Sequence, residues 1–262
     1  LARIVHTTNG FAFHHLDDAL HILADLGYDG VAWTPDVHHL DPMRATAAEV
    51  AAFGRLLEAT GLELIVETGA RFVLDPRRKH RPNLLDAPDE AAVRQAFLAR
   101  CVDIAAELGS GLVTVWSGAL PPGVDAQTAR SRLVDGLRAL CDHAATRDVE
   151  IGFEPEPGML VERADAWPAL RDAVDRPSLR LTLDVGHCLA TDEGQPANVL
   201  RALAPDVAAL QLDDHRRGTH DHLAFGEGEV DFEALAAAVA GDGGAASMAS
   251  IIRWRCACTL GA

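Results

Sequence analysis

The chain has 262 residues, of which 48% are hydrophobic and 24% charged, and its formal net charge is −16 at pH 7. This length fits one or two domains, and this much apolar sequence can bury a large core without disulfides. Proteins that bind nucleic-acid backbones carry a basic face, so we expect no nucleic-acid partner, although a local pocket can still attract an anion.

Short apolar runs recur along the chain and predict β-strands. Each run is about four to seven residues long, as in parallel strands that are buried on both faces. In chain order the runs are 2–7, 30–34, 63–68, 111–117, 150–154, 180–184 and 207–212.

Amphipathic stretches between these runs predict helices. Gly27, Gly61 and Gly109 each follow a helical stretch and precede a strand, which is typical of the left-handed residue that ends many helices. The clearest apolar stripes are Leu16, Leu20 and Leu23, then Val93, Phe97, Cys101, Ile104 and Leu108, then Leu133, Leu137, Leu140 and Ala144.

Strands that alternate with helices at intervals of roughly 30 residues imply a parallel sheet with right-handed crossovers. A doubly wound open sheet is the structural rival, because periodicity does not show whether a sheet closes. We favour closure, since no Gly-x-Gly-x-x-Gly or P-loop sequence follows a strand. The predicted fold is therefore α/β, a single TIM-type (β/α)₈ barrel over residues 1–262, with an atypical segment at 241–262.

A short basic segment, residues 75–82, follows the third predicted strand. It reads equally well as a solvated loop or as a lid that presents cations to an anionic group of a substrate.

Polar residues stand where several predicted strands end, and barrel active sites form at that end. Several carboxylates on one rim would repel one another unless a cation lay among them. Imidazole and carboxylate ligands together suit zinc, manganese or related ions, so we predict a divalent-metal site. The residues concerned are Glu67, Glu154, Asp184, His187, Gln211, Asp214, His215, His220 and His222.

These patterns differ in specificity. Leu183-Asp-Val-Gly-His187 is the most specific, because an acid, a tight turn and a histidine follow an apolar strand. His220-x-His222 gains weight from the turn Phe225-Gly-Glu-Gly228 that comes after it. A lone strand-end glutamate serves just as well as a helix cap or an ion-pair partner.

A resemblance emerges from the motifs of the second half. Phe153-Glu-Pro-Glu-Pro-Gly158, Leu183-Asp-Val-Gly-His187, Leu210-Gln-Leu-Asp-Asp214 and the run from His222 to Phe232 resemble the xylose isomerase-like TIM barrel superfamily. That group holds sugar isomerases and epimerases and also type IV apurinic endonucleases. The first half matches only in its strand–helix rhythm.

The resemblance implies roles for individual residues. Glu154 falls on the metal-binding glutamate of the fifth strand, with Glu156 as the alternative if the register is shifted by two. Asp184 falls on the metal-binding aspartate of the sixth strand. His187 matches a histidine that contacts substrate in the epimerases and binds an additional zinc ion in the endonucleases. His220 and His222 resemble the Asp-x-His pair of that additional site, with His in place of Asp.

Two departures from the family pattern stand out. Gln211 replaces the usual metal-binding histidine of the seventh strand, which favours manganese or magnesium over zinc. The eighth strand of the family ends in an acid–base glutamate, whereas residues 243–262 contain no acid. The second departure puts the isomerase mechanism in doubt, not the fold.

The favoured function is a metal-dependent sugar or sugar-phosphate isomerase or epimerase, which moves a proton on a carbon next to a carbonyl. Glu154 and His187 are the expected catalytic residues, and Glu67 is the remaining strand-end glutamate that can supply a second proton-transfer group. Trp33 and Trp116, with Phe13, are candidates for the walls of the substrate pocket, although each also reads as a core residue. We expect the metal (zinc, manganese or magnesium) on Glu154, Asp184, His187, Gln211, His220 and His222.

Two alternative functions remain open. One is phosphodiester hydrolysis of the apurinic-endonuclease type, which the histidines favour and the net charge disfavours. The other is a barrel that binds metal without turnover, which the missing eighth-strand glutamate favours.

The five cysteines have no regular spacing and indicate reduced thiols of a cytoplasmic protein. The N-terminal residues lack the pattern of a signal peptide, and no apolar run is long enough to span a membrane. We expect a cytoplasmic enzyme with a small carbohydrate substrate, and a homo-oligomer is compatible with the sequence.

Overall fold

The computed structural model describes residues 3–241 and 251–254. Eight parallel strands form a closed barrel in the order β1 to β8, and β8 completes the ring by pairing with both β7 and β1. The strands are β1 (Arg3–Thr7), β2 (Gly30–Trp33), β3 (Glu63–Glu67), β4 (Leu112–Val115), β5 (Glu150–Phe153), β6 (Leu179–Asp184), β7 (Val207–Leu212) and β8 (Ile251–Trp254). The prediction of a closed barrel is therefore confirmed, and the open doubly wound sheet is excluded.

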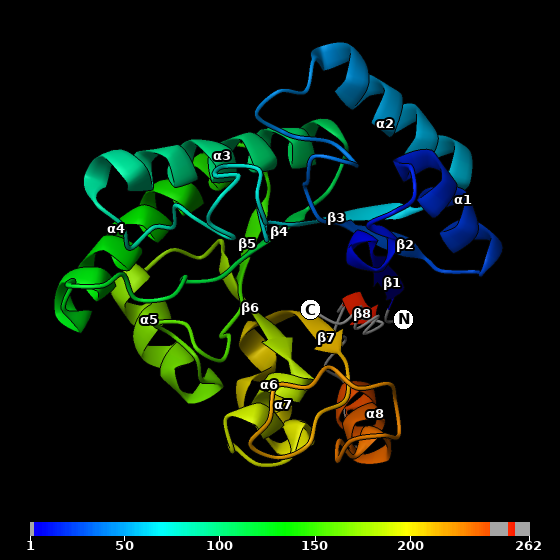
Figure 1. Ribbon diagram of the computed structural model, residues 1–262. Coiled ribbons are helices and arrows are strands. Elements are labelled where there is room, and N and C mark those ends of the chain that lie inside the picture. Colours follow the sequence, from blue (N-terminus) through cyan, green and yellow to red (C-terminus); the bar gives the residue numbers. More distant parts are fainter. Residues whose placement is uncertain (1–2, 242–250, 255–262) are drawn as a thin grey trace.

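The helices lie outside the ring of strands (Figure 1). They are α1 (Leu16–Asp25), α2 (Ala47–Thr60), α3 (Pro88–Glu107), α4 (Ala126–Ala145), α5 (Trp167–Val174), α6 (Val185–Ala190), α7 (Pro196–Leu203) and α8 (Phe232–Ala240). Short 3₁₀ turns span Thr8–Phe11, Ala164–Ala166 and Ala204–Asp206.

Local sequence explains several helix ends. Thr46 and Glu49 form a reciprocal capping box at the start of α2, which satisfies two otherwise unbonded N–H groups. Gly61 ends the same helix in the left-handed conformation, at φ 70°. Gly27 and Gly109 also have positive φ, as the sequence predicts.

Side chains alternate between the two faces of each strand, and this alternation divides the core. Among the residues whose side chains the structure describes, a small hydrophobic cluster lies inside the barrel and is formed by Val5, Ala32, Ile65, Leu112 and Ala209. The larger cluster lies between strands and helices and includes Val31, Trp33, Val66, Phe153 and Leu183. We call the residues of a strand that point into the barrel, which recur at every second position, its inner series. Members of this series at the carboxyl end of a strand face the mouth of the barrel.

Most of the atypical segment 241–262 lies outside the described residues; Gly241 and the backbone of β8 are the described parts. Cys101, Cys141 and Cys188 are buried and free, whereas Cys256 and Cys258 lie outside the described residues. Within the described part of the chain, no helix combines the length and apolar character needed to cross a bilayer.

Candidate metal centre at the carboxyl ends of the strands

The barrel mouth is lined by residues that continue the inner series of each strand. Gly152 is followed two residues later by Glu154, Thr182 by Asp184, and Ala209 by Gln211 and then Asp213. Because side chains repeat with a period of two, these polar groups face the same interior. The four polar residues are almost fully buried, with 2% or less of their surface exposed.

Glu154 and Gln211 are in direct contact across the barrel mouth. The amide Nε2 of Gln211 donates a hydrogen bond to Oε2 of Glu154 at 2.5 Å. This contact turns the amide oxygen of Gln211 away from Glu154, and that buried oxygen has no hydrogen-bond partner among the described residues. A buried acceptor of this kind is costly unless a donor or a cation meets it.

Asp184 and His187 are held by the start of α6. Oδ1 of Asp184 caps the helix by accepting hydrogen bonds from the backbone N–H groups of Gly186 and His187, at 2.9 and 3.1 Å. Oδ2 of Asp184 lies 3.7 Å from Nε2 of His187. The short turn after β6 thus brings both side chains to the mouth of the barrel.

The ring of His187 is fixed in orientation by the turn after β5. Nδ1 lies 3.0 Å from the carbonyl oxygen of Pro155, which is an acceptor only, so Nδ1 carries the proton and donates it. Nε2 then keeps its lone pair, and it has no hydrogen-bond partner among the described residues. A backbone carbonyl that fixes the tautomer in this way is typical of histidines that ligate metals.

Ligand atoms of Glu154, Asp184 and His187 all lie within 4.8 Å of one another. Together with the amide oxygen of Gln211, they supply two carboxylates, one imidazole and one neutral oxygen at a single buried place. Hard divalent cations prefer such oxygen-rich sets, and the imidazole also admits zinc. The residues present therefore fit a divalent ion.

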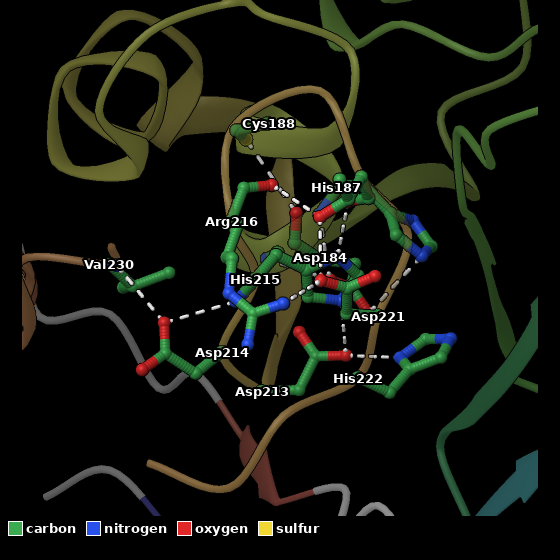
Figure 2. Close-up of polar contacts among 12 residues, drawn as sticks. Asp184, His187, Cys188, Asp213, Asp214, His215, Arg216, Asp221, His222 and Val230 are labelled. Atoms are coloured by element: carbon green, nitrogen blue, oxygen red, sulfur yellow. Dashed lines mark hydrogen bonds and ion pairs between the residues drawn. The ribbon is translucent and has the colours of Figure 1, made fainter. Parts of the chain in front are cut away.

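A second cluster of Asp213, His215 and His222 lies beside the first (Figure 2). Oδ2 of Asp213 accepts hydrogen bonds from Nε2 of His215 at 2.9 Å and from Nδ1 of His222 at 2.5 Å. Burial raises the pKa of Asp213, but the bonds from the two histidines outweigh it and hold that pKa well below its usual range. Asp213 therefore stays ionised and orients both rings.

His215 is held differently from its neighbours. Its two ring nitrogens face Oδ2 of Asp213 and the carbonyl oxygen of Thr219, at 2.9 and 3.2 Å. Burial lowers the pKa of His215, yet Asp213 outweighs burial and the net pKa is raised. With an acceptor at each nitrogen, the ring of His215 is held between Asp213 and Thr219.

His220 lies close to both clusters, near His187 of the first and His222 of the second. Its ring centre lies 4.9 Å from that of His187 and 4.4 Å from that of His222. Although part of its surface is exposed, burial of the ring, together with the nearby His187, His222 and His215, lowers the pKa of His220 to about 3. His220 is therefore neutral at pH 7 and offers a nitrogen lone pair to a metal. Ligand atoms of His220, His215 and His222 lie within 4.8 Å of one another, and so do ligand atoms of His220, Glu156 and His187.

The predicted ligands thus meet in one region. Glu154, Asp184, His187 and Gln211 lie together, and His220 and His222 adjoin them through His187. Glu156 does not replace Glu154 in the inner series, although it lies close to His187 and His220.

Glu67 occupies the same layer on the β3 side of the barrel mouth. Its Oε2 accepts hydrogen bonds from the hydroxyls of Thr7 and Thr34, at 2.8 and 3.1 Å. Two hydroxyl groups thus hold this carboxylate oxygen in place at the barrel mouth.

The three aromatic candidates lie in different places. Trp33 is fully buried on the helix side of the sheet, where it packs edge-on against Phe53 of α2 at 5.4 Å. Trp116 follows β4 and contacts His80 and the guanidinium of Arg94. Phe13 is 85% exposed in the loop after β1. Of the three, only Trp116 continues an inner series, that of Leu112 and Thr114.

Sequence reasoning missed Thr7, Thr34 and Asp213, although a signal for all three exists. Each continues the alternation of an inner strand residue by two, as Asp213 does after Ala209 and Gln211. Asp214, one residue on, has a structural role instead. Its carboxylate accepts hydrogen bonds from four backbone N–H groups, those of His215, Gly226, Gly228 and Val230. These bonds fix the loop beside the histidines.

Known proteins share the sequence pattern behind this geometry. The family model described as xylose isomerase-like TIM barrel matches residues 20–250. The 3-dehydroshikimate dehydratase of Pseudomonas aeruginosa is 30% identical over 202 residues, which are 76% of this chain and 28% of that protein. The L-ribulose-5-phosphate 3-epimerase UlaE of Escherichia coli is 25% identical over 171 residues, which are 64% of this chain and 60% of that protein. This chain therefore matches less than two thirds of the length of either relative.

Solved structures agree on the fold. A D-tagatose 3-epimerase-like protein superposes with a TM-score of 0.79, covering 97% of this chain and 90% of that chain at 17% identity. An L-ribulose 3-epimerase superposes with a TM-score of 0.76, covering 97% and 81% at 17% identity.

Proposed function

The chain belongs to the xylose isomerase-like TIM barrel family, and on that premise we propose that it is a divalent-metal-dependent sugar isomerase or epimerase. It would remove a proton from the carbon next to a carbonyl of a small polyhydroxylated substrate. The observation that carries the proposal is the convergence of Glu154, Asp184, His187 and Gln211, where the buried Nε2 of His187 and Oε1 of Gln211 have no hydrogen-bond partner among the described residues.

Glu154, Asp184 and Gln211 would hold the ion, with His187 beside them. Because three of these four groups offer oxygen, the set favours manganese or magnesium over zinc. A divalent ion bound there would polarise the substrate carbonyl and stabilise the negative charge that develops on its oxygen.

The remaining chemistry belongs to the side chains of this chain. Glu154 is the candidate base, and Glu67, on the β3 side of the mouth, is the candidate for returning the proton. Nε2 of His187 accepts a hydrogen bond from a substrate hydroxyl, since Nδ1 is already committed to Pro155. A proton taken on one face of the substrate and returned on the other gives an epimer.

Dehydration is the second candidate. The similarity to a 3-dehydroshikimate dehydratase over 202 residues favours it. Removal of a proton next to a carbonyl is common to both reactions, and the step after it differs. An epimerase returns the proton, whereas a dehydratase expels a neighbouring hydroxyl as water. The products therefore distinguish them.

The proposal is tested by solvent exchange and metal binding. We expect the manganese-loaded protein to exchange a carbon-bound proton with D₂O in one member of a panel of ketoses, ketose phosphates and 3-dehydroshikimate. Glu154→Gln should lower that exchange by about 10²–10⁴-fold and weaken manganese binding in calorimetry. Glu150→Gln is the matched control, since Glu150 lies at the other end of β5 and pairs with Arg180.

Three results would overturn the proposal. Equal manganese affinity in Glu154→Gln and the wild type would remove the metal assignment. Metal binding without exchange in any substrate would favour a non-catalytic barrel, and cleavage of abasic DNA instead would favour phosphodiester hydrolysis.

A further inference from the structure

The loop between β3 and α3 carries an arginine that is anchored by an amide. Arg71 lies four residues after Glu67, and its Nη2 donates a hydrogen bond to the amide oxygen of Asn9 at 2.6 Å. Among the described residues no carboxylate lies within ion-pair distance of this guanidinium. Two further arginines of the same loop do have carboxylate partners: Arg78 pairs with Asp75 and Glu90, and Arg81 with Asp86.

The backbone holds Arg71 in an unusual conformation. Ala70 and Arg71 have φ values of 57° and 27°, in the region that residues with a Cβ rarely adopt. The carbonyl of Arg71 accepts a hydrogen bond from the N–H of His80 at 2.6 Å, and Nδ1 of His80 donates to the carbonyl of Gly69. His80 in turn packs edge-on against Trp116 at 5.4 Å. His80 thus ties the segment that carries Arg71 to the later part of the same loop.

Hydrogen bonds connect Arg71 to the mouth of the barrel. Its partner Asn9 donates through its backbone N–H to Oγ1 of Thr7 at 3.2 Å. Thr7 donates in turn to Oε2 of Glu67 at 2.8 Å. The guanidinium is therefore anchored to the strand ends that surround the proposed substrate site.

The surroundings of Arg71 are positive. Arg94 is only 2% exposed beneath the same loop, where it donates to the carbonyl of Thr68 at 2.7 Å and lies 5.0 Å from the Trp116 ring. His80 adds no charge, because burial, together with the nearby Lys79, Arg94 and Arg71, lowers the pKa of His80 to about 4. The charge around Arg71 is therefore positive, although the chain as a whole has a net charge of −16.

We propose that Arg71, positioned by Asn9, binds an acidic group of the substrate, a carboxylate or a phosphate. The planar fork of a guanidinium matches the two oxygens of either group, and Asn9 is bonded to one of its two terminal nitrogens. This inference rests on the proposed function and narrows it, since neutral ketoses would be poor substrates.

The test compares Arg71→Gln with Arg77→Gln, a neighbouring exposed cation of the same loop. Binding of inorganic phosphate and of D-glycerate to the full chain is measured by calorimetry, with and without manganese. We expect Arg71→Gln to weaken binding of at least one anion more than about tenfold, and Arg77→Gln to change it less than about threefold. The anion that binds more tightly identifies phosphate ester or carboxylate as the substrate group.

A second variant guards against a folding defect. Arg71→Lys keeps the charge but loses the fork, so it should restore only part of the anion affinity. Equal anion binding by Arg71→Gln and the wild type would overturn the inference. So would an unchanged KM of Arg71→Gln for an acidic substrate. Anion binding needs no turnover, so it tests Arg71 even if the proposed reaction is never observed.

Discussion

At the end of β2, Trp33 and Thr34 are adjacent in the chain yet face opposite sides of the sheet. Trp33 packs against Phe53 of α2, whereas the hydroxyl of Thr34 donates to Glu67 in the mouth of the barrel. The same alternation places Gln211 and Asp213 inside the barrel mouth, with their neighbour Leu212 only partly buried. A shift of one residue therefore separates a core residue from a candidate ligand.

Gln211 is the residue at which metal preference can be tested most directly. Replacing it by histidine exchanges an amide oxygen for an imidazole nitrogen, which zinc prefers. We expect Gln211→His to raise the affinity for zinc relative to manganese by roughly tenfold, measured by competition calorimetry. Gln195→His, remote in a surface contact with Glu229 and Asp231, is the control. An unchanged zinc-to-manganese ratio would place Gln211 outside the metal site.

At the scale of elements, α6 is a six-residue helix whose position depends on close packing. Asp184 caps it, and Gly186 in its first turn lies directly against His215 and Asp213. A Cβ added to Gly186 would overlap both side chains. The absence of a side chain at this position is what allows the helix carrying His187 to approach the second cluster.

Gly186→Ala should therefore destabilise the protein by about 1–3 kcal/mol. It should also weaken metal binding, because the overlap displaces either His187 or the hydrogen-bonded side chains of Asp213 and His215. Chemical denaturation and calorimetry measure the two effects. Gly111→Ala provides the comparison, since a Cβ added there meets no atom within 4 Å. Wild-type stability in Gly186→Ala would show that α6 can move without cost.

For the whole molecule, the protonation of a buried histidine makes the free energy of unfolding depend on pH in the acid range. The folded protein keeps His80 neutral down to about pH 4, because burial, aided by three nearby cations, lowers its pKa from 6.5. Well above pH 6.5 the residue is neutral in both the folded and the unfolded chain. As the pH falls from 6.5 toward 4, the unfolded chain gains the proton first, so the free energy of unfolding decreases.

Replacing His80 by glutamine should remove this part of the pH dependence. One histidine contributes at most about 1.4 kcal/mol per pH unit to the slope. We expect the unfolding free energy of His80→Gln to depend less steeply on pH between 6.5 and 4 than that of the wild type, as measured by urea denaturation at several pH values. Identical slopes would mean that His80 is protonated equally in both states.

Much of this architecture could be predicted from the sequence, because period and turn residues are local signals. The seven predicted strands agree with the structure to within two residues at each end. The family resemblance implied that His220 meets His187, but the hydrogen bonds of Asp213 with His215 and His222 and the bond between Arg71 and Asn9 could not be predicted. Each joins residues whose proximity depends on how a loop folds over the barrel mouth, and hydrophobic period carries no information about that.

Two hydrogen-bonded groups among the described residues of the polar lining come from different parts of the chain. Glu67 with Thr7 and Thr34 comes from β1 to β3, and Glu154 with Gln211 comes from β5 and β7. These bonds share no residue. After gene duplication, substitutions around β1 to β3 and substitutions around β5 to β7 would therefore act on different hydrogen bonds, so a descendant could change one of the two groups and inherit the other unaltered.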